Sequence, residues 1–100
     1  MKKMYADYAK LLKALGEPTR LQIMDMISCG ELCACIIQEK FDITQPTLSH
    51  HMKVLCEVGL AVARKDGKWI YYSVKHDVVN ELGNFIAMLA VVDKKCICKE

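Results

Sequence analysis

The chain has 100 residues, a formal net charge of +2 and an apolar content of 53%. This length fits one domain, expected over residues 1–100, but is too short to bury so much apolar surface in a monomer, which favours a subunit interface. We expect no secretory signal, because charged residues interrupt the N-terminal segment, and the longest apolar run, residues 85–92, is too short to cross a bilayer. The six cysteines of a cytoplasmic chain indicate metal, redox or packing roles rather than a disulfide scaffold.

Apolar residues at helical spacing predict a first helix over residues 4–15, which Gly16 ends. A second helix has Pro18 in its first turn, where the missing N–H costs nothing, and it ends before Gly30. A short helical segment over residues 33–41 follows.

The next helix is predicted from "FDITQPTLSHHMKVLCEVG", with Thr44 as its N-cap, Pro46 in its first turn and Gly59 as its C-terminal stop. Two strands then surround Asp66-Gly67, a strong hairpin signal, and an amphipathic helix follows Asp77, a candidate N-cap. The expected fold is therefore mostly helical with a small β-hairpin: a winged helix-turn-helix whose terminal helices dimerise.

The helix after Thr44 is the expected recognition helix, which would enter the major groove of double-stranded DNA. Its face opposite the apolar stripe carries compact hydrogen-bonding groups and one lysine, suited to base edges and phosphates. These residues are Gln45, Thr47, Ser49, His50 and Lys53. His51 borders the apolar stripe and is expected to be a hydrogen-bonded packing residue.

The hairpin is expected to supply phosphate contacts. Residues 44–75 carry five basic and two acidic side chains, and they form the only basic third of the chain. Lys65 and Lys68 are expected to face each other across Asp66-Gly67, an unfavourable pairing that DNA phosphates would relieve, and Arg64 adds a third cation. Trp69 is expected to pack at the root of the wing.

Two thiols, Cys33 and Cys35, lie at the expected start of the first helix of the helix-turn-helix. The helix dipole favours thiolates there, and thiolates bind soft metals and metalloids. Two positions along an ideal helix are about 200° apart, so both sulfurs can hold one ion only if the helix start is extended or unwinds.

A second pair, Cys96 and Cys98, lies among lysines near the C-terminus. This pair could form its own site, add a ligand to Cys33 and Cys35 across a dimer, or be inert. Cys29 and Cys56 are expected to be packing thiols.

These segments resemble the ArsR/SmtB family of metal-responsive winged-helix repressors, and specifically its arsenic-responsive branch. The segment "LKALGEPTRLQIM" resembles the family's second-helix signature, and "ELCAC" resembles its metalloid box. The segment "QPTLSHHMKVLCEVGL" resembles its recognition helix, and "RKDGKWIYYSV" resembles its wing. The resemblance implies a homodimer that binds operator DNA without a cofactor. It also implies release when As(III), Sb(III), an organoarsenical or a soft divalent ion binds the thiolates, and it implies neither enzymatic activity nor a membrane partner.

The chain departs from the family pattern in two places. The box of arsenic sensors commonly continues with an acidic residue and a third cysteine, where this chain has Ile36 and Gln38. The zinc-type site of the last helix is missing, because that segment has only His76. We therefore expect either a two-thiolate site, which would favour an arsenical that already carries one organic group, or recruitment of Cys96 or Cys98.

Two other functions compete with the arsenical-responsive repressor. A thiol redox or persulfide sensor could use the same fold, with Cys33 or Cys35 linked to a second cysteine. A thiol oxidoreductase is disfavoured, because the cysteine pair does not follow a strand of a βαβ unit and no convergent base is evident.

Overall fold

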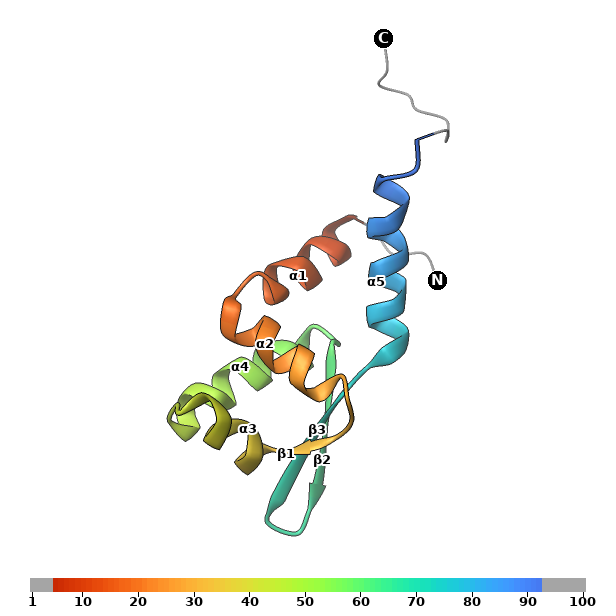
Figure 1. The fold of residues 1–100 in the computed structure, drawn as a ribbon. Helices are drawn as coiled ribbons and strands as arrows, with labels where there is room; N and C mark the ends of the chain where they lie inside the picture. Colours follow the sequence, from red (N-terminus) through yellow and green to blue (C-terminus); the bar gives the residue numbers. More distant parts are fainter. Residues whose placement is uncertain (1–4, 93–100) are drawn as a thin grey trace.

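The computed structural model describes residues 5–92 of the chain. Five helices and three strands follow one another in the predicted order (Figure 1), with one strand more than the sequence predicted. They are α1 (Tyr5–Leu15), α2 (Pro18–Ile27), β1 (Leu32–Cys33), α3 (Ala34–Phe41), α4 (Gln45–Glu57), β2 (Ala61–Asp66), β3 (Trp69–Val74) and α5 (His76–Leu89). The predicted winged helix-turn-helix is confirmed, with α3 and α4 as the two short helices.

The ends of α4 are set by the residues that the sequence indicated. The Thr44 hydroxyl caps the helix by accepting the Thr47 backbone N–H at 3.3 Å, and Pro46 lies in the first turn. Gly59 follows the helix with φ of 90°, a conformation that favours glycine. Between α3 and α4, Asp42 takes the left-handed conformation, with φ of 51°, so that a turn of three residues separates the helices.

The buried apolar side chains form one cluster to which α1, α2, α3, α4, α5 and the sheet all contribute. Its most deeply buried members are Ile23, Ile27, Ile37, Met52, Leu55 and Leu60. Arg20 joins this packing across three helices: its Nε donates to the Ala14 carbonyl at 2.7 Å, and its Nη1 lies 3.2 Å from His51 Nδ1. His51 is therefore a hydrogen-bonded packing residue, as predicted.

The three strands form an antiparallel sheet in the order β1-β3-β2. The register of the hairpin corrects one expectation, because Lys65 pairs with Ile70 and Asp66 pairs with Trp69. The two-residue turn is Gly67-Lys68, so Lys68 lies in the turn and does not face Lys65. Gly67 has φ of 63° and Lys68 has no positive φ, which is the pattern of a type II′ turn.

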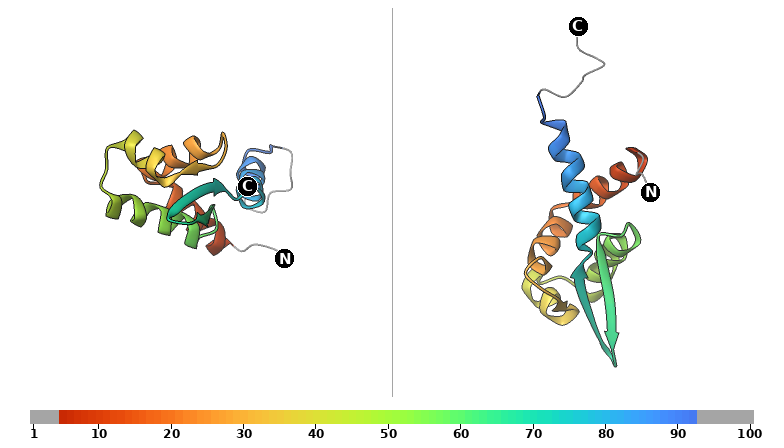
Figure 2. Two further views of the ribbon diagram at one scale, coloured as in Figure 1. Left: turned by 90° about the horizontal axis from the view of Figure 1, so that it is seen from below. Right: turned by 90° about the vertical axis from the view of Figure 1, so that its right-hand side faces the viewer.

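The last helix, α5, packs against α1 at the end of the molecule opposite the wing (Figure 2). The rings of Tyr8 and Phe85 stack with centroids 4.1 Å apart, and Leu82 is buried. The helix begins at His76 with Lys75 as its N-cap residue, so the expected cap at Asp77 is wrong. Its far half exposes Ile86, Met88 and Leu89, which are 43%, 50% and 63% exposed.

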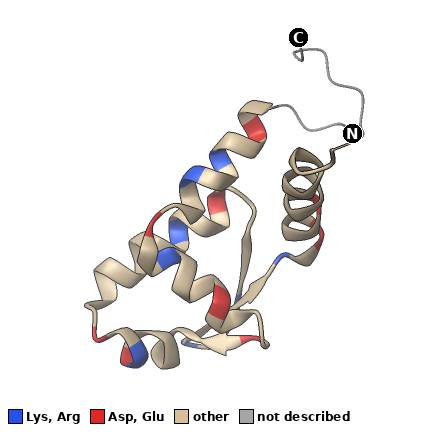
Figure 3. Ribbon diagram, turned by 45° about the horizontal axis from the view of Figure 1, so that its top comes forward, with Lys and Arg blue, Asp and Glu red and all other residues tan. Residues whose placement is uncertain are grey.

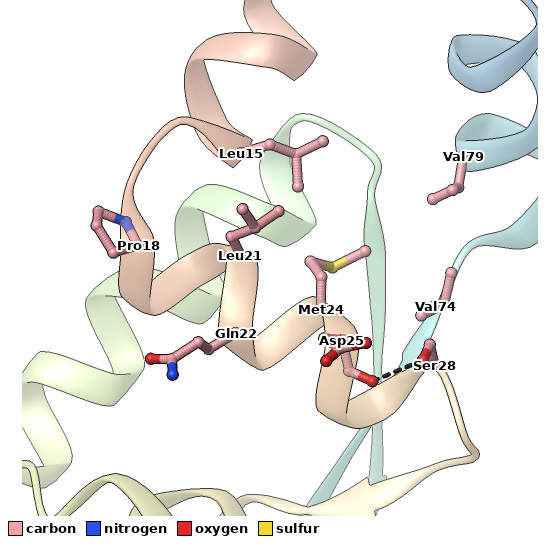
Figure 4. A pocket seen from close by; sticks show the side chains of 9 residues that line it. All are labelled: Leu15, Pro18, Leu21, Gln22, Met24, Asp25, Ser28, Val74 and Val79. Carbon is pink, nitrogen blue, oxygen red and sulfur yellow. Dashed lines mark hydrogen bonds between the residues drawn. The ribbon is translucent and has the colours of Figure 1, made fainter.

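An open, largely apolar groove of about 830 Å³ lies between α2 and the junction of β3 with α5. Leu21 and Met24 of α2 lie on one side of it and Val79 of α5 on the other (Figure 4). Leu21 is 55% exposed there. A single chain thus leaves apolar surface uncovered on α2 as well as on the terminal helices. Within residues 5–92, no helix combines the length and apolarity needed to cross a membrane.

Candidate metalloid and DNA-binding site

Cys33 and Cys35 lie side by side where β1 passes into α3. Cys33 is the N-cap residue, with extended backbone angles of φ −69° and ψ 143°, and Cys35 is in the first turn. The Cys35 Sγ donates a hydrogen bond to the Cys33 Sγ over 2.9 Å. The extended helix start, one of the two expected arrangements, brings the sulfurs together without unwinding α3. One ion with bonds of about 2.3 Å can bridge this gap.

The two thiols differ in acidity. The hydrogen bond from the Cys35 thiol lowers the pKa of Cys33, and the backbone N–H groups at the start of α3 lower it further. The same hydrogen bond raises the pKa of Cys35, because its proton is held by the Cys33 sulfur. The start of α3 therefore favours the thiolate at Cys33, whereas at Cys35 the backbone N–H groups lower the pKa less than the hydrogen bond to Cys33 raises it.

The thiol pair is connected directly to the wing, a connection that the sequence did not reveal. Cys33 pairs with Tyr71 across β1 and β3. Two residues earlier, Glu31 accepts hydrogen bonds from Arg64 Nε and Nη2 at 2.9 and 2.8 Å. The Arg64 guanidinium also lies 4.6 Å from the centre of the Tyr71 ring. Arg64, expected as a phosphate ligand, is thus engaged within the chain.

A pocket of about 220 Å³ separates the thiol pair from the recognition helix and the wing turn. Its walls come from the end of β1, from α3 as far as Gln38, from the first turns of α4, and from the hairpin from Lys68 onward. It is lined by Cys33, Ala34, Cys35, Gln38, Gln45, Leu48, Ser49, Lys68, Trp69, Ile70 and Tyr72. Trp69, expected at the root of the wing, instead lies next to its turn and is 47% exposed.

The predicted recognition residues all lie on the exposed side of α4, while Leu48, Met52 and Leu55 face the core. Gln45 and Ser49 border the pocket that the thiols line. The Thr47 hydroxyl accepts a hydrogen bond from the Thr44 hydroxyl at 2.9 Å. His50 is exposed, and the exposed Lys53 lies 4.0 Å from Glu57, close enough only for a weak ion pair.

Charged residues are distributed unevenly over the fold (Figure 3). The only Asp, Glu, Lys or Arg residues of α5 are Asp77 and Glu81. Lys65 and Lys68, in contrast, are exposed at the end of the wing, and Lys68 lines the same pocket as Gln45 and Ser49 of α4. Cations and hydrogen-bonding groups therefore lie on the surface that α4 and the wing share.

The other cysteines occupy different surroundings. Cys56 is partly buried, and desolvation raises its pKa, as expected of a packing thiol. Cys29 is exposed, so the expectation that it packs is wrong. Cys96 and Cys98 lie outside the described residues. Within residues 5–92, no three His, Cys, Asp or Glu side chains are grouped to hold a metal ion, so the Cys33 and Cys35 pair has no third such ligand there.

A short helix pair whose second helix exposes polar side chains next to a basic hairpin defines a winged-helix DNA-binding protein. Residues 17–62 match the family described as "Bacterial regulatory protein, arsR family". The "Arsenical resistance operon repressor" of Staphylococcus aureus is 40% identical, over 95% of this chain and 91% of the relative. The chain belongs to the ArsR family.

Solved structures agree with this assignment. HlyU from Vibrio cholerae superposes with a TM-score of 0.74 and 29% identity, covering 90% of this chain and 98% of HlyU. The homodimeric winged helix-turn-helix DNA-binding domain of Mb0332 from Mycobacterium bovis superposes with a TM-score of 0.71 and 29% identity. The match covers 85% of this chain and 79% of that domain. The chain is a DNA-binding transcriptional repressor and, as predicted, not an enzyme.

Proposed function

We propose that the chain represses an operon by binding its operator as a homodimer, and that a trivalent arsenical or antimonial releases it by binding Cys33 and Cys35. Gln45, Thr47, Ser49, His50 and Lys53 would face the major groove, and Lys65 and Lys68 would contact phosphates. The proposed place of action is the cytoplasm, where thiols remain reduced.

The observation that carries this proposal is the 2.9 Å separation of two accessible sulfurs at an extended helix start. Thiolates are the ligands that soft ions prefer, and one of the two already has a lowered pKa. The identity to arsenical resistance operon repressors supports a metalloid over other soft ions.

The thiol pair is well placed to oppose DNA binding. Because Cys33 belongs to both the sheet and the cap of α3, an ion held by both sulfurs constrains the backbone between the wing and the helix-turn-helix. A ligand shifts the equilibrium only by its differential affinity for the two states, and near-complete release requires about 5.5 kcal/mol. Metalloid–sulfur bonds that are stronger in the released form than in the DNA-bound form by this amount would release the operator.

The proposed dimer would use the exposed apolar residues of α1 and α5. Tyr5 and Leu12 of α1 are exposed, as are Ile86 and Leu89 of α5. Two-fold symmetry then requires an operator with matched half-sites, so that both recognition helices bind equivalent sequences.

Fluorescence anisotropy with labelled operator tests the proposal. The reduced protein should bind without any added ion, arsenite or a trivalent organoarsenical should release it, and excess dithiol should restore binding by removing the arsenical. Binding that persists at saturating levels of every trivalent arsenical would contradict the proposed inducer.

A second candidate is a redox sensor of the same fold, favoured by the same short sulfur separation. In that case an oxidant accepts two electrons from the Cys33 and Cys35 thiols, two protons are lost and a disulfide forms. Intact mass spectrometry separates the two functions, because a disulfide lowers the mass by two hydrogens whereas an arsenical adds the mass of the bound group.

A further inference from the structure

We propose that the pocket between the thiol pair and the wing holds the organic substituent of an arylarsenical, which makes aryl-substituted trivalent arsenicals preferred inducers. This inference rests on the proposed function, which it refines by naming the ligand class and the residues that select it.

The pocket has the required size and position. Its volume is about 220 Å³, and both Cys33 and Cys35 line it. An apolar protein cavity of about 150 Å³ is known to accept benzene, so a phenyl ring attached to a sulfur-bound arsenic fits the space next to these thiols.

The pocket lining combines aromatic and aliphatic side chains with the polar side chains of Gln38, Gln45 and Ser49. Leu48 is buried behind the pocket, Ile70 and Tyr72 are at least partly buried, and the ring of Trp69 is half-exposed beside them. No carboxylate lines this pocket, and its one cation, Lys68, lies 5.5 Å from the Trp69 ring centre. Burial against Trp69 and Ile70 would remove a phenyl ring from water, the main source of affinity for apolar groups.

A neighbouring hollow is a poorer alternative. It borders Cys35 but not Cys33, and its lining includes the carboxylates of Glu39 and Asp42. A ring placed there would contact charged groups that bind water strongly, and its arsenic would reach only one of the two sulfurs.

The valence of arsenic fits a site with two thiols. A phenylarsenous acid, with one carbon and two hydroxyl groups on As(III), exchanges both hydroxyls for the two sulfurs and releases two waters, with no change of oxidation state. Its third bond remains to carbon, so a third protein thiol is not needed. Arsenite bound by the same two sulfurs would keep one hydroxyl as its third bond, since residues 5–92 group no third His, Cys, Asp or Glu with the pair.

The same pocket is bordered by residues proposed to contact DNA. Gln45 and Ser49 of α4 and Lys68 of the wing all line it. An aryl group in the pocket therefore lies between the recognition helix and the wing, and competes with the operator for these side chains.

The test uses the full chain carrying Cys96→Ser/Cys98→Ser, so that the tail thiols cannot bind. Phenylarsenous acid, methylarsonous acid and arsenite are titrated, with affinity read by calorimetry and by operator release. Trp69, the only tryptophan of the chain, reports binding by its fluorescence. We expect phenylarsenous acid to bind on the order of tenfold more tightly than methylarsonous acid and to change the Trp69 emission.

Two pocket variants and one control complete the design. Trp69→Val and Ile70→Ala should each reduce the phenyl preference to about threefold or less while keeping methylarsonous acid affinity, because the thiols are unchanged. Val62→Ala removes an exposed apolar side chain from β2, outside the pocket, and should keep the full preference. Thermal unfolding checks that each variant is folded.

The outcomes separate this inference from the proposed function. Release by all three arsenicals without a phenyl preference, or a preference that survives both pocket variants, overturns the pocket assignment alone. If the Cys96→Ser/Cys98→Ser chain binds no arsenical, the sensor thiols are Cys96 and Cys98, and the pocket assignment is overturned. If no arsenical releases even the wild-type chain from the operator, both the proposed function and the pocket assignment are wrong.

Discussion

The Glu31 carboxylate accepts two hydrogen bonds from the Arg64 guanidinium, at 2.9 and 2.8 Å, and thereby joins the residue two positions before Cys33 to the wing. Arg64 lowers the pKa of Glu31 through this contact. The ion pair therefore contributes stability above the ordinary glutamate pKa and loses it as the pH falls through the lowered folded-state pKa.

Glu31→Gln should remove that acid-dependent contribution. We expect the stability of the wild type to fall more than that of the variant between about pH 6 and about pH 3, measured by urea unfolding. Glu39→Gln, which removes an exposed carboxylate from α3, should keep the wild-type profile. Identical profiles for the wild type and Glu31→Gln would show that the pair adds nothing to stability.

Cys33→Ser and Cys35→Ser should each bind the operator normally and fail to release it with arsenicals, because one sulfur cannot replace two. Cys29→Ser and Cys56→Ser should respond like the wild type, measured by anisotropy over the same titration. If Cys96→Ser/Cys98→Ser alone abolishes release while Cys33→Ser/Cys35→Ser does not, the sensor is the tail.

Lys65→Ala/Lys68→Ala should weaken binding to operator and random DNA alike, because phosphate contacts carry no sequence information. The slope of log K against log salt concentration should become shallower by about 2 units. Lys10→Ala/Lys13→Ala removes the same charge from α1 and should leave the slope unchanged. A wild-type slope in the wing variant contradicts the wing assignment.

Gln45→Ala and Ser49→Ala should instead relax sequence preference. Each is expected to cost about 1–3 kcal/mol on the operator and little on random DNA, since base-edge contacts are lost. Lys53→Ala provides the contrast, because loss of a phosphate ligand should weaken both complexes equally. Competition binding with the two DNAs measures the ratio, and an unchanged ratio for both α4 variants would remove Gln45 and Ser49 from the recognition surface.

The wild-type chain should sediment as a dimer at micromolar concentration. Leu89→Asp places a charge on the exposed apolar end of α5 and should shift the chain toward monomer without unfolding it. Asn80→Asp adds the same charge to an exposed site earlier in α5 and should remain dimeric. A monomeric wild-type chain would refute the proposed assembly.

Much of the fold could be predicted from local signals, because proline, threonine and glycine fix helix ends through their own backbone chemistry. Thr44, Pro46 and Gly59 lie where the sequence indicated. The strand β1 could not be found in this way, since two residues carry no periodicity and Leu32 and Cys33 are extended because β3 pairs with them. The hairpin turn lies one residue later than the predicted Asp66-Gly67, because Gly67 takes the first of the two turn positions.

The candidate site was predicted in its residue types but not in its geometry. The rotation between two positions of an ideal helix separates Cys33 from Cys35, but Cys33 lies before the first helical residue. The pocket that joins the thiols to Trp69, and the pairing of Glu31 with Arg64, bring together residues more than 30 positions apart in the chain. Such contacts leave no local pattern in the sequence.

The brevity of α3 has a mechanical consequence. Its eight residues form a rod of about 12 Å, with Cys33 at one end and the left-handed Asp42 at the other, three residues before α4 begins. A rod of two turns is too short to bend appreciably, and only three residues, with Asp42 in the left-handed conformation, connect it to α4. We therefore expect a tilt of α3 at its Cys33 end to displace the first turn of α4 as well.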